Sequence, residues 1–545
     1  MEGRRVVRNY RKKTSVKRIL SITLLLLLAV VAAGVYLKKF NNDKDTYTPI
    51  AYEPVTEMTE DKNKGYAIST SCKEATDAGV KVLENGGNAV DAAIAVSYTL
   101  AVAEPYASGL GGGGCMLVFD PATEKYYFYN YGAEAAASGF SSTVLVPGMV
   151  SGMEAVRTDF GTMSLSELLE EPIKYCDGFD ITEVFAVRID RASGMLGENS
   201  IYCENGRWLS TGDKLVQPEL KETLMTLASE GADSFYTGSI ASKISSEIGM
   251  SMGDLEAYET IRTDAVMGEY GEYTVASAAA PYSGMTLVQM LKMSEKLNMP
   301  SPDDNNQAFV EGLQRITATA HNDRVSHVYD YRFAKSDIDE SQYVTDAYIS
   351  ELLNLDYSNY EEEESEDTTA FSIIDGNGMI VVCTNTLSSY FGAKIEVGGF
   401  YLNNSGGNFG TVVNAYAPGK RPRTHISPTI LRAEDEILAI ASPGGNAIVK
   451  ILATVISDIC RYGTDAETAV NKQRLMFKTS DVIYYEIGYD TENFATAGGV
   501  GFTTIPSSDH SLFGCVALAG YNVKEGYYAV ADPRRDSLAE YINKK

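Results

Sequence analysis

The sequence predicts a large α+β protein that can bury an extensive core. Its 545 residues exceed one small module and allow several average domains, or one large α/β or α+β domain. Hydrophobic residues make up 44% of the chain and aromatic residues 10%, a composition that excludes disorder or a fibrous repeat for most of its length. Helical patterns prevail before Thr368, and the chain is rich in strand patterns after it.

Charge is distributed very unevenly along the chain. Residues 1–39 hold ten Lys or Arg and one acidic residue, which leaves 36 basic and 72 acidic residues, a net charge of −36, for the remainder. A surface this acidic repels phosphate backbones and anionic lipid headgroups. We therefore expect no nucleic acid among the partners of the protein.

The cysteines and histidines form no metal-binding pattern. Seven cysteines occur without a CxxC pair, most of them in apolar runs such as those around Cys115 and Cys383, so we predict small core residues and no disulfide framework. The four histidines form neither HxxxH nor HxxE, which argues against a zinc enzyme.

An apolar run near the N-terminus predicts a membrane anchor. Residues 19–37 include five successive leucines and would form a helix roughly 28 Å long, close to the ~30 Å hydrocarbon thickness of a bilayer. Eight Lys or Arg precede this run and two follow it, so residues 1–18 are expected in the cytoplasm and the body outside. Residues 38–60 are predicted to form a stalk. A cleaved signal peptide is the alternative, but the length of the run and the two lysines after it favour an uncleaved signal anchor.

Helix and strand signals alternate through the first two thirds of the chain. Apolar periodicity and end signals predict helices at 74–84, 89–103, 164–177, 218–230, 285–297 and 303–331. The second of these is apolar nearly all round, which predicts a buried helix. Strands are predicted at 115–119, 126–131 and 273–278.

A glycine-rich loop at residues 109–114 precedes the first of these strands. It lacks the GK[ST] of a phosphate loop and leads into a strand instead of a helix, so a nucleotide site is weakly supported. Close backbone packing and a role in lining a site are the two interpretations that remain open.

An acidic segment and a hairpin follow each other near the middle of the chain. Residues 361–367 contain six acids in seven positions, which predicts a solvated loop. Strand patterns at 371–374 and 379–383 flank Asp375-Gly-Asn-Gly378, a strong hairpin signal. If Asp375 pairs with Gly378, Thr368 falls opposite Asn385, and Thr386 lies within one position of Thr368.

Thr368 is a candidate nucleophile because of its position. A threonine hydroxyl is weak unless a base stands beside it, and the α-amine of an N-terminal threonine can be that base. A cut between Asp367 and Thr368, at the end of an accessible acidic loop, would create such a residue. The simpler interpretation is that Thr368 starts a strand.

Ten motifs, in order along residues 64–540, resemble the γ-glutamyltranspeptidase family of the N-terminal-nucleophile hydrolases: Glu84–Ala93, Glu104–Gly114, Val146–Gly152, Gly212–Pro218, Thr368–Ser372, Leu402–Asn404, Lys420–Pro422, Ser427–Thr429, Ser442–Gly445 and Ala531–Arg534. The resemblance implies a four-layer αββα sandwich without metal or organic cofactor. It also implies that residues 61–367 and 368–545 are the large-subunit and small-subunit parts of one catalytic domain, which pair after self-cleavage between Asp367 and Thr368.

The resemblance also implies roles for single residues. Thr368 matches the self-processing residue and nucleophile of the family, and Thr386 matches the threonine that hydrogen-bonds it. Gly444 and Gly445 match the pair whose backbone N–H groups form the oxyanion hole, where fixed donors stabilise the charge of a tetrahedral intermediate.

Six positions that correspond to the substrate clamp of the family carry other or neutral residues: Gly132, Ser388, Ser405, Asn408, Thr424 and His425. The family's carboxylate-binding arginine corresponds to Gly132, and its amine-binding aspartate to Asn408. Each lost charge-assisted hydrogen bond costs ~1.5–3 kcal/mol. Arg423 or His425 is a candidate replacement.

The sequence thus predicts a membrane-anchored, extracytoplasmic, self-processing γ-glutamyltransferase or hydrolase that forms an acyl ester on Thr368. Its expected substrates are of the glutathione or poly-γ-glutamyl type, and a branch of the family that works on poly-γ-glutamate at the bacterial surface fits the anchor and the altered clamp. The alternatives are an acylase of the same fold acting on a different amide, and a surface binding protein with a decayed site.

Overall fold

The computed structural model describes residues 65–543, apart from 141, 356, 358–359, 361–367 and 492–501. The predicted cytoplasmic tail, membrane anchor and stalk, and the Asp367 side of the predicted cleavage site, lie outside these residues and stay predictions. No helix among the described residues has both the length and the apolar character needed to cross a bilayer.

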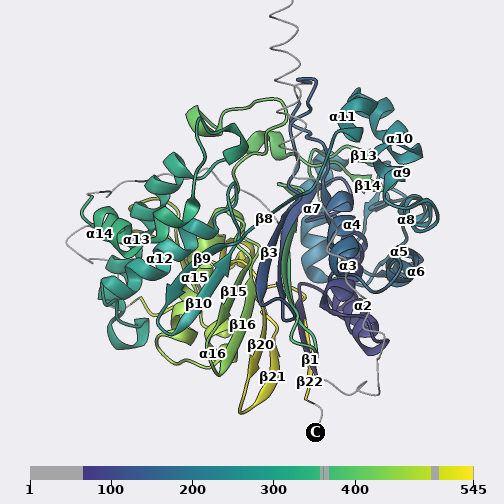
Figure 1. Ribbon diagram of the computed structural model, residues 1–545. Helices are drawn as coiled ribbons and strands as arrows, with labels where there is room; N and C mark the ends of the chain where they lie inside the picture. Colours follow the sequence, from purple (N-terminus) through teal and green to yellow (C-terminus); the bar gives the residue numbers. More distant parts are fainter. Residues whose placement is uncertain are drawn as a thin grey trace, which may run out of the picture. The chain divides into compact units, whose positions relative to one another are not determined.

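Two antiparallel sheets form the centre of the structure (Figure 1). The first sheet has seven strands in the spatial order β22 (Leu538–Ile542), β1 (Tyr66–Thr70), β11 (Thr369–Ile374), β12 (Ile380–Thr386), β2 (Gly113–Asp120), β3 (Lys125–Asn130) and β8 (Ile261–Thr263). The second has six, in the order β21 (Gly526–Val530), β20 (Ala517–Asn522), β16 (Glu436–Ala441), β15 (Thr429–Arg432), β10 (Tyr273–Ser277) and β9 (Val266–Tyr270). The sheets pack face to face through β1, β11 and β12 on one side and β16 and β20 on the other.

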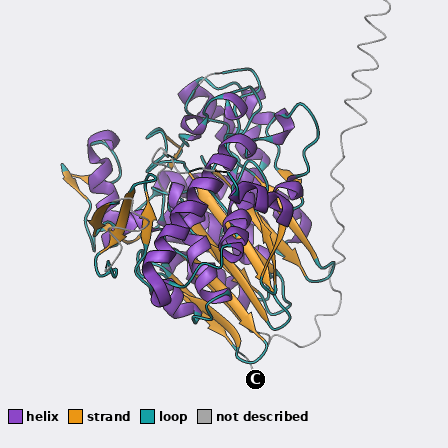
Figure 2. Cartoon of the chain, turned by 90° about the vertical axis from the view of Figure 1, so that its left-hand side faces the viewer, coloured by secondary structure: helices purple, strands orange, loops and turns teal. Residues whose placement is uncertain are grey.

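Helices cover the outer face of each sheet, so the fold is the predicted four-layer αββα sandwich (Figures 1 and 2). The first sheet is covered by α2 (Lys73–Glu84), α3 (Ala89–Ala103) and α4 (Met149–Phe160), and the second by a layer formed of α12 (Gly284–Lys296), α13 (Pro302–His327) and α15 (Ile448–Cys460). The other α-helices are α5 (Leu165–Leu168), α6 (Glu170–Tyr175), α7 (Glu183–Leu196), α8 (Pro218–Glu230), α9 (Asp233–Tyr236), α10 (Ser239–Ile248), α11 (Met252–Glu256), α14 (Asp346–Leu353) and α16 (Ala466–Asn471). Short strand groups are β4 (Phe179–Asp180) with β7 (Lys214–Leu215), β5 (Cys203–Glu204) with β6 (Arg207–Trp208), β13 (Glu396–Val397) with β14 (Phe400–Tyr401), and β17 (Leu475–Phe477), β18 (Val482–Glu486) and β19 (Thr503–Ser507).

The strands of the first sheet are apolar on both faces because both faces are covered. In β11, Phe371 and Ile373 pack with the helices outside the sheet, whereas Ala370 and Ile374 join the core between the two sheets. Successive side chains of a strand point to opposite faces, so one unbroken apolar run supplies two cores.

Four of the six predicted helices agree with the structure to within one residue at each end. The helix predicted at 303–331 forms as α13 but ends at His327, four residues before its predicted end. α8 begins and ends at the predicted residues, and every residue of α3 is buried. The single helix predicted at 164–177 is wrong, because the chain forms α5 and α6 with a break at Leu169. The cysteines are core residues as predicted, with five of the seven buried and the other two, Cys203 and Cys460, half-buried.

The predicted hairpin exists, but its predicted register is wrong by one residue. Ile374 pairs with Ile380 and Thr369 with Asn385, so Asp375 closes the turn with Met379 instead of Gly378. The Asp375 carboxylate accepts hydrogen bonds from the N–H groups of Asn377 (2.8 Å) and Met379 (3.1 Å) and thereby holds a three-residue loop. Continued by one residue, the observed register places Thr368 directly opposite Thr386.

Asp375 also joins the hairpin to the helical layer. Its second carboxylate oxygen accepts a hydrogen bond from the N–H of Ala89, the first residue of α3, at 2.9 Å. Burial raises the pKa of this carboxyl group, while hydrogen bonds from surrounding N–H groups lower it. One side chain therefore fixes both the hairpin register and the start of the buried helix.

We expect Asp375→Ala to lower the free energy of unfolding by about 2–4 kcal/mol, because three N–H groups lose a buried charged acceptor. Urea denaturation measures the loss. Glu434→Ala, at an exposed position in the turn between β15 and β16, is the matched control and should change the free energy by less than about 0.5 kcal/mol. Equal losses in the two variants would contradict this role of Asp375.

Candidate active site

One small pocket collects most of the residues that the sequence singled out. It is lined by Thr368, Thr386, Ser388, Asn408, Thr424, His425, Ile426, Gly445 and Ile448. These residues come from the start of β11, the end of β12, three loops and the start of α15. The first sheet, the loops next to β15 and β16 of the second sheet, and the helix α15 thus each contribute to the same hollow.

Thr368 lies at the point where the chain enters the central sheet. It directly precedes β11 and is buried, with 4% of its surface exposed. Its carbonyl oxygen accepts a hydrogen bond from Nη1 of Arg535 at 2.9 Å. Arg535 comes directly after Arg534 in the chain. Arg534 belongs to a buried ionic network in which Asp532 contacts Arg474 (2.7 Å) and Arg534 (3.1 Å). That network explains the Ala531–Arg534 motif as a support for the arginine that contacts Thr368.

Thr386 ends β12 and has an ordered hydroxyl. Its Oγ1 accepts a hydrogen bond from the N–H of Ser388 at 2.8 Å. Ser388 adopts φ = 77°, a left-handed conformation that is uncommon for residues other than glycine. The tight turn after β12 therefore places the Ser388 amide and the Thr386 hydroxyl together at the pocket that also contains Thr368.

Gly444 and Gly445 connect β16 to α15. Both have positive φ, 129° and 55°, and the chain then makes one 3-10 turn before α15 begins at Ile448. Glycine tolerates these conformations without strain, and the turn leads into the N-terminal end of α15, whose dipole attracts anions. Gly445 lines the pocket; Gly444 precedes it in the chain but does not line the pocket.

The glycine-rich loop at 109–114 supports the site by close backbone packing against the end of β12. A Cβ atom on Gly112 would lie 2.4 Å from the carbonyl oxygen of Thr386. Gly113 pairs with Thr386, and Gly114 pairs with Asn385, in the first sheet. Of the two interpretations left open by the sequence, close packing is therefore the one that the structure supports.

The substrate positions predicted by the resemblance divide into two groups. Asn408, Thr424 and His425 line the pocket together with Ser388. Ser405 does not line it: it is buried at the start of the 3-10 turn that ends at Asn408, and its N–H donates to Oδ1 of Asn403.

Arg423 does not replace the missing arginine of the clamp. Its Nη1 donates to the carbonyl oxygens of Arg324 (3.2 Å) and Val325 (3.0 Å) in the last turn of α13. The Arg324 carbonyl also accepts from the N–H of Val328 at 2.9 Å, whereas the Val325 carbonyl is one of those that a helix end leaves without an intrahelical partner. The Arg423 side chain thus caps a helix, and His425 is the one of the two candidates that reaches the pocket.

The surroundings of Gly132 explain why no larger side chain stands there. A Cβ atom on Gly132 would lie 2.8 Å from the hydroxyl of Tyr282, which itself donates to the carbonyl oxygen of Gly114. Arg421 runs past Gly132, and its guanidinium contacts Glu134 (3.1 Å) and the carbonyl of Asn130 (2.6 Å). The space that an arginine at position 132 would need is occupied, and Arg421 is engaged in internal contacts.

Sequence reasoning did not identify a buried carboxylate network next to Thr368. Glu104 accepts hydrogen bonds from the hydroxyls of Ser71 (2.7 Å), Thr369 (2.6 Å) and Tyr106 (2.9 Å). Glu104 is the first residue of one of the motifs that resemble the family, and this position was the feature of the sequence that could have indicated its role. The three donors come from β11 and from segments before and after α3, so the network ties these elements together beside Thr368.

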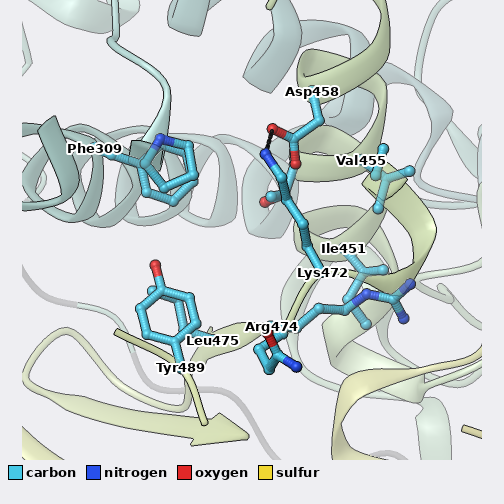
Figure 3. Close-up of a pocket in the computed structure, with 12 residues that line it drawn as sticks. Phe309, Ile451, Val455, Asp458, Lys472, Arg474, Leu475 and Tyr489 are labelled. Carbon is cyan, nitrogen blue, oxygen red and sulfur yellow. Dashed lines mark hydrogen bonds and ion pairs between the residues drawn. The ribbon is translucent and has the colours of Figure 1, made fainter. Parts of the chain in front are cut away.

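A second hollow, between α13, α15 and the start of β17, belongs to the packing of these elements and not to the predicted site (Figure 3). Phe309, Ile451 and Val455 give it apolar walls. Its charged groups pair within the protein, Lys472 with Asp458 at 3.2 Å and Arg474 with Asp532. None of the predicted site residues lines it.

Comparison with known proteins agrees with this geometry. The family model described as Gamma-glutamyltranspeptidase matches residues 75–542. The chain is 37% identical over 431 residues to the capsule biosynthesis protein CapD proenzyme of Bacillus anthracis, covering 78% of this chain and 81% of that protein. It is 30% identical over 563 residues to the glutathione hydrolase proenzyme of Bacillus subtilis strain 168, covering 91% and 94% of the two chains.

The fold is shared with a solved acylase. The structure of cephalosporin acylase from Bacillus halodurans aligns with a TM-score of 0.79 over 91% of this chain and 99% of that one, at 21% identity. At this identity the likeness shows the fold alone. Together with the family match over most of its length, it shows that the chain is an enzyme of the γ-glutamyltranspeptidase family with the N-terminal-nucleophile hydrolase fold.

Proposed function

We propose that the protein cuts its own chain before Thr368 and then transfers or hydrolyses an acyl group through an ester on the Thr368 hydroxyl. The observation that carries this proposal is the presence of Thr368, Thr386 and Gly445 in one small pocket. A nucleophile, a hydroxyl partner and a backbone donor for an oxyanion are the parts that acyl transfer requires.

The reaction proceeds in two acyl steps. The Thr368 Oγ1 attacks the substrate carbonyl while the α-amine freed by self-cleavage takes the hydroxyl proton. The N–H groups of Gly444 and Gly445 stabilise the tetrahedral oxyanion, and its collapse expels the amine leaving group, which takes up a proton. Water or a second amine then attacks the ester and restores the Thr368 hydroxyl.

The acyl donor is inferred from the charges at the pocket. Among the described residues that line it, only His425 has a side chain that can carry a charge, and self-cleavage adds the α-amine of Thr368. A free γ-glutamyl group brings an ammonium and a carboxylate on its α-carbon, and both need partners once water is excluded. A donor without the free amine, such as a glutaryl or internal poly-γ-glutamyl unit, leaves fewer ions without a partner.

The cellular location follows from the first 60 residues. We propose that residues 19–37 anchor the protein as a single-pass signal anchor, that residues 1–18 stay in the cytoplasm, and that the catalytic domain lies outside the membrane. The basic flank before the apolar run supports this orientation.

Self-cleavage is tested with the Thr368→Ala variant of the full chain. Without the hydroxyl nothing attacks the preceding carbonyl, so we expect a single unprocessed chain on a denaturing gel. The wild type and Thr368→Ser, which keeps a hydroxyl, should give a fragment of about 178 residues, from position 368 to 545. N-terminal sequencing of that fragment checks the cut. Processing of Thr368→Ala at the same bond would assign the cut to another protease.

Donor preference is tested with a γ-glutamyl anilide and its des-amino analogue, glutaryl anilide. We expect the wild type to have the higher kcat/KM for the glutaryl donor. Asn408→Asp adds a negative charge at the pocket and should improve the γ-glutamyl donor relative to the glutaryl donor by about 10-fold or more, the equivalent of one charge-assisted hydrogen bond.

Asn205→Asp is the matched control, because it makes the same charge change in the exposed turn between β5 and β6, and Asn205 does not line the pocket. It should leave the ratio of the two donors unchanged. A wild type that prefers the γ-glutamyl anilide would show that other groups, His425 first among them, rebuild the clamp.

Topology is tested on intact cells. Protease added outside should digest the catalytic domain, while an epitope placed before residue 19 stays protected, because the basic flank holds that end in the cytoplasm. Recovery of the full-length protein in the cytosolic fraction would refute the anchor.

A further inference from the structure

The carboxyl group of Glu104 lies in an unfavourable place for a negative charge. Glu104 is 2% exposed and is the C-cap residue of α3. Burial of a charge costs free energy, and the negative end of a helix dipole repels a carboxylate. Within the described part of the chain no basic side chain pairs with Glu104, and the donors that reach it are three hydroxyl groups. Residues that break local rules in this way are typical of functional sites.

Two of the three hydroxyl groups converge on one oxygen of Glu104. Its Oε2 accepts from Ser71 at 2.7 Å and from Thr369 at 2.6 Å, and these two hydroxyl oxygens are themselves 2.5 Å apart. Its Oε1 accepts from the hydroxyl of Tyr106 at 2.9 Å. All four residues are at most 2% exposed. The carboxyl group therefore holds the Thr369 side chain in one orientation inside the protein.

Thr369 is the residue directly after the proposed nucleophile. It is the first residue of β11 and pairs with Asn385 of β12. Thr368 lines the pocket, whereas Thr369 and Glu104 do not. The strand end that presents the Thr368 hydroxyl to the pocket is thus held by a contact outside the pocket.

The peptide group between Thr368 and Thr369 is fixed at two points. Nη1 of Arg535 donates to its carbonyl oxygen at 2.9 Å, and Glu104 binds the side chain that follows it. Rotation of this peptide group would move the Thr368 hydroxyl relative to the preceding carbonyl carbon. Reacting atoms must be held about 3–3.5 Å apart with the correct alignment, and small displacements slow a reaction strongly.

We propose that Glu104 is a positioning residue for self-cleavage that acts through the Thr369 hydroxyl, an inference that rests on the proposed function. In the cleavage the Thr368 Oγ1 attacks the carbonyl carbon of residue 367, the peptide C–N bond breaks, and the hydroxyl proton ends on the new α-amine. Water then hydrolyses the resulting ester, which leaves a carboxyl group on residue 367 and returns a proton to Oγ1. Glu104 exchanges no atom in these steps. It fixes the strand end from which the hydroxyl attacks.

Pulse–chase labelling of the full chain in cells tests the proposal. Conversion to the fragment from position 368 to 545 is followed on denaturing gels. Glu104→Gln keeps the size of the side chain but leaves one acceptor oxygen in place of two, and we expect it to slow cleavage about tenfold or more.

Asp91→Asn is the matched control. Asp91 is a buried carboxylate at the other end of α3, roughly 20 Å away along the helix axis, and it also accepts from a hydroxyl, that of Thr162 at 2.6 Å. Its replacement makes the same change of group in the same helix, away from Thr369, so it should leave the cleavage rate of the wild type.

Two variants of Thr369 separate positioning from packing, and they also decide the proposal if Glu104→Gln does not fold. Thr369→Ser keeps the hydroxyl and should cleave close to the wild-type rate. Thr369→Val keeps the shape without the hydroxyl and should be as slow as Glu104→Gln. A residue that only fills space would give the reverse order. The double variant should be no slower than the slower single one, because both changes remove the same contact.

Cleavage of Glu104→Gln at the wild-type rate, or equal slowing by Asp91→Asn, would overturn the role of Glu104. Faster cleavage of Thr369→Val than of Thr369→Ser would overturn the route through the Thr369 hydroxyl. These outcomes leave the proposed function intact as long as the wild type cleaves and Thr368→Ala does not. Cleavage of Thr368→Ala at the same bond would instead refute the proposed function and this inference with it.

Discussion

The pairing of β11 with its two neighbours is the constraint on which the rest of the site depends. β11 lies third from one edge of the first sheet, hydrogen-bonded to β1 on one side and β12 on the other. Because side chains alternate along a strand, a slip of one residue would turn every side chain of β11 to the wrong face. The two cores and the Asp375 turn therefore fix where Thr368 emerges, and they place it opposite Thr386.

The same pairing holds the two halves of the chain together. β1, β2, β3 and β8 precede Thr368, whereas β11, β12 and β22 follow it, and all seven share one sheet. In the order of the sheet, β1 is placed between β22 and β11, so a strand of the first half is inserted between two of the second. A cut before Thr368 would break one peptide bond and none of these pairings. This topology allows a chain to release a new N-terminus inside its own core without coming apart.

Local signals in the sequence predicted much of the fold, and long-range contacts account for what they did not. The nearly uniform apolar character of α3 and the bounds of α8 depend on neighbouring residues and were predicted correctly. The hairpin register was wrong by one because the Asp375 side chain, and not the backbone alone, sets the turn. Likewise, the motifs predicted which residues meet around Thr368, but not that Arg423 caps α13, a contact between residues nearly one hundred positions apart.

Position 132 is a second case in which long-range contacts could not be predicted from the sequence. The sequence indicates that a glycine replaces the arginine of the family, which predicts a weakened clamp. It does not indicate that Tyr282 and Arg421 fill the space, because these residues lie about 150 and 290 positions further along the chain. The change at Gly132 is thus part of a repacked region, and an arginine at that position alone would meet Tyr282.

The pocket around Thr368 and the wide cleft lined by β3, β8 and β9 differ in the charged side chains that line them. In the proposed mechanism the Thr368 pocket stabilises a developing oxyanion, and the positive end of the α15 dipole favours this charge. The described residues that line it include no Asp or Glu. The cleft at the edge of the sandwich is lined instead by several acidic residues, among them Glu124, Asp264 and Asp339. In a chain with a large excess of acidic residues, the fold thus keeps the described acidic side chains out of the pocket in which the proposed anionic intermediate would form.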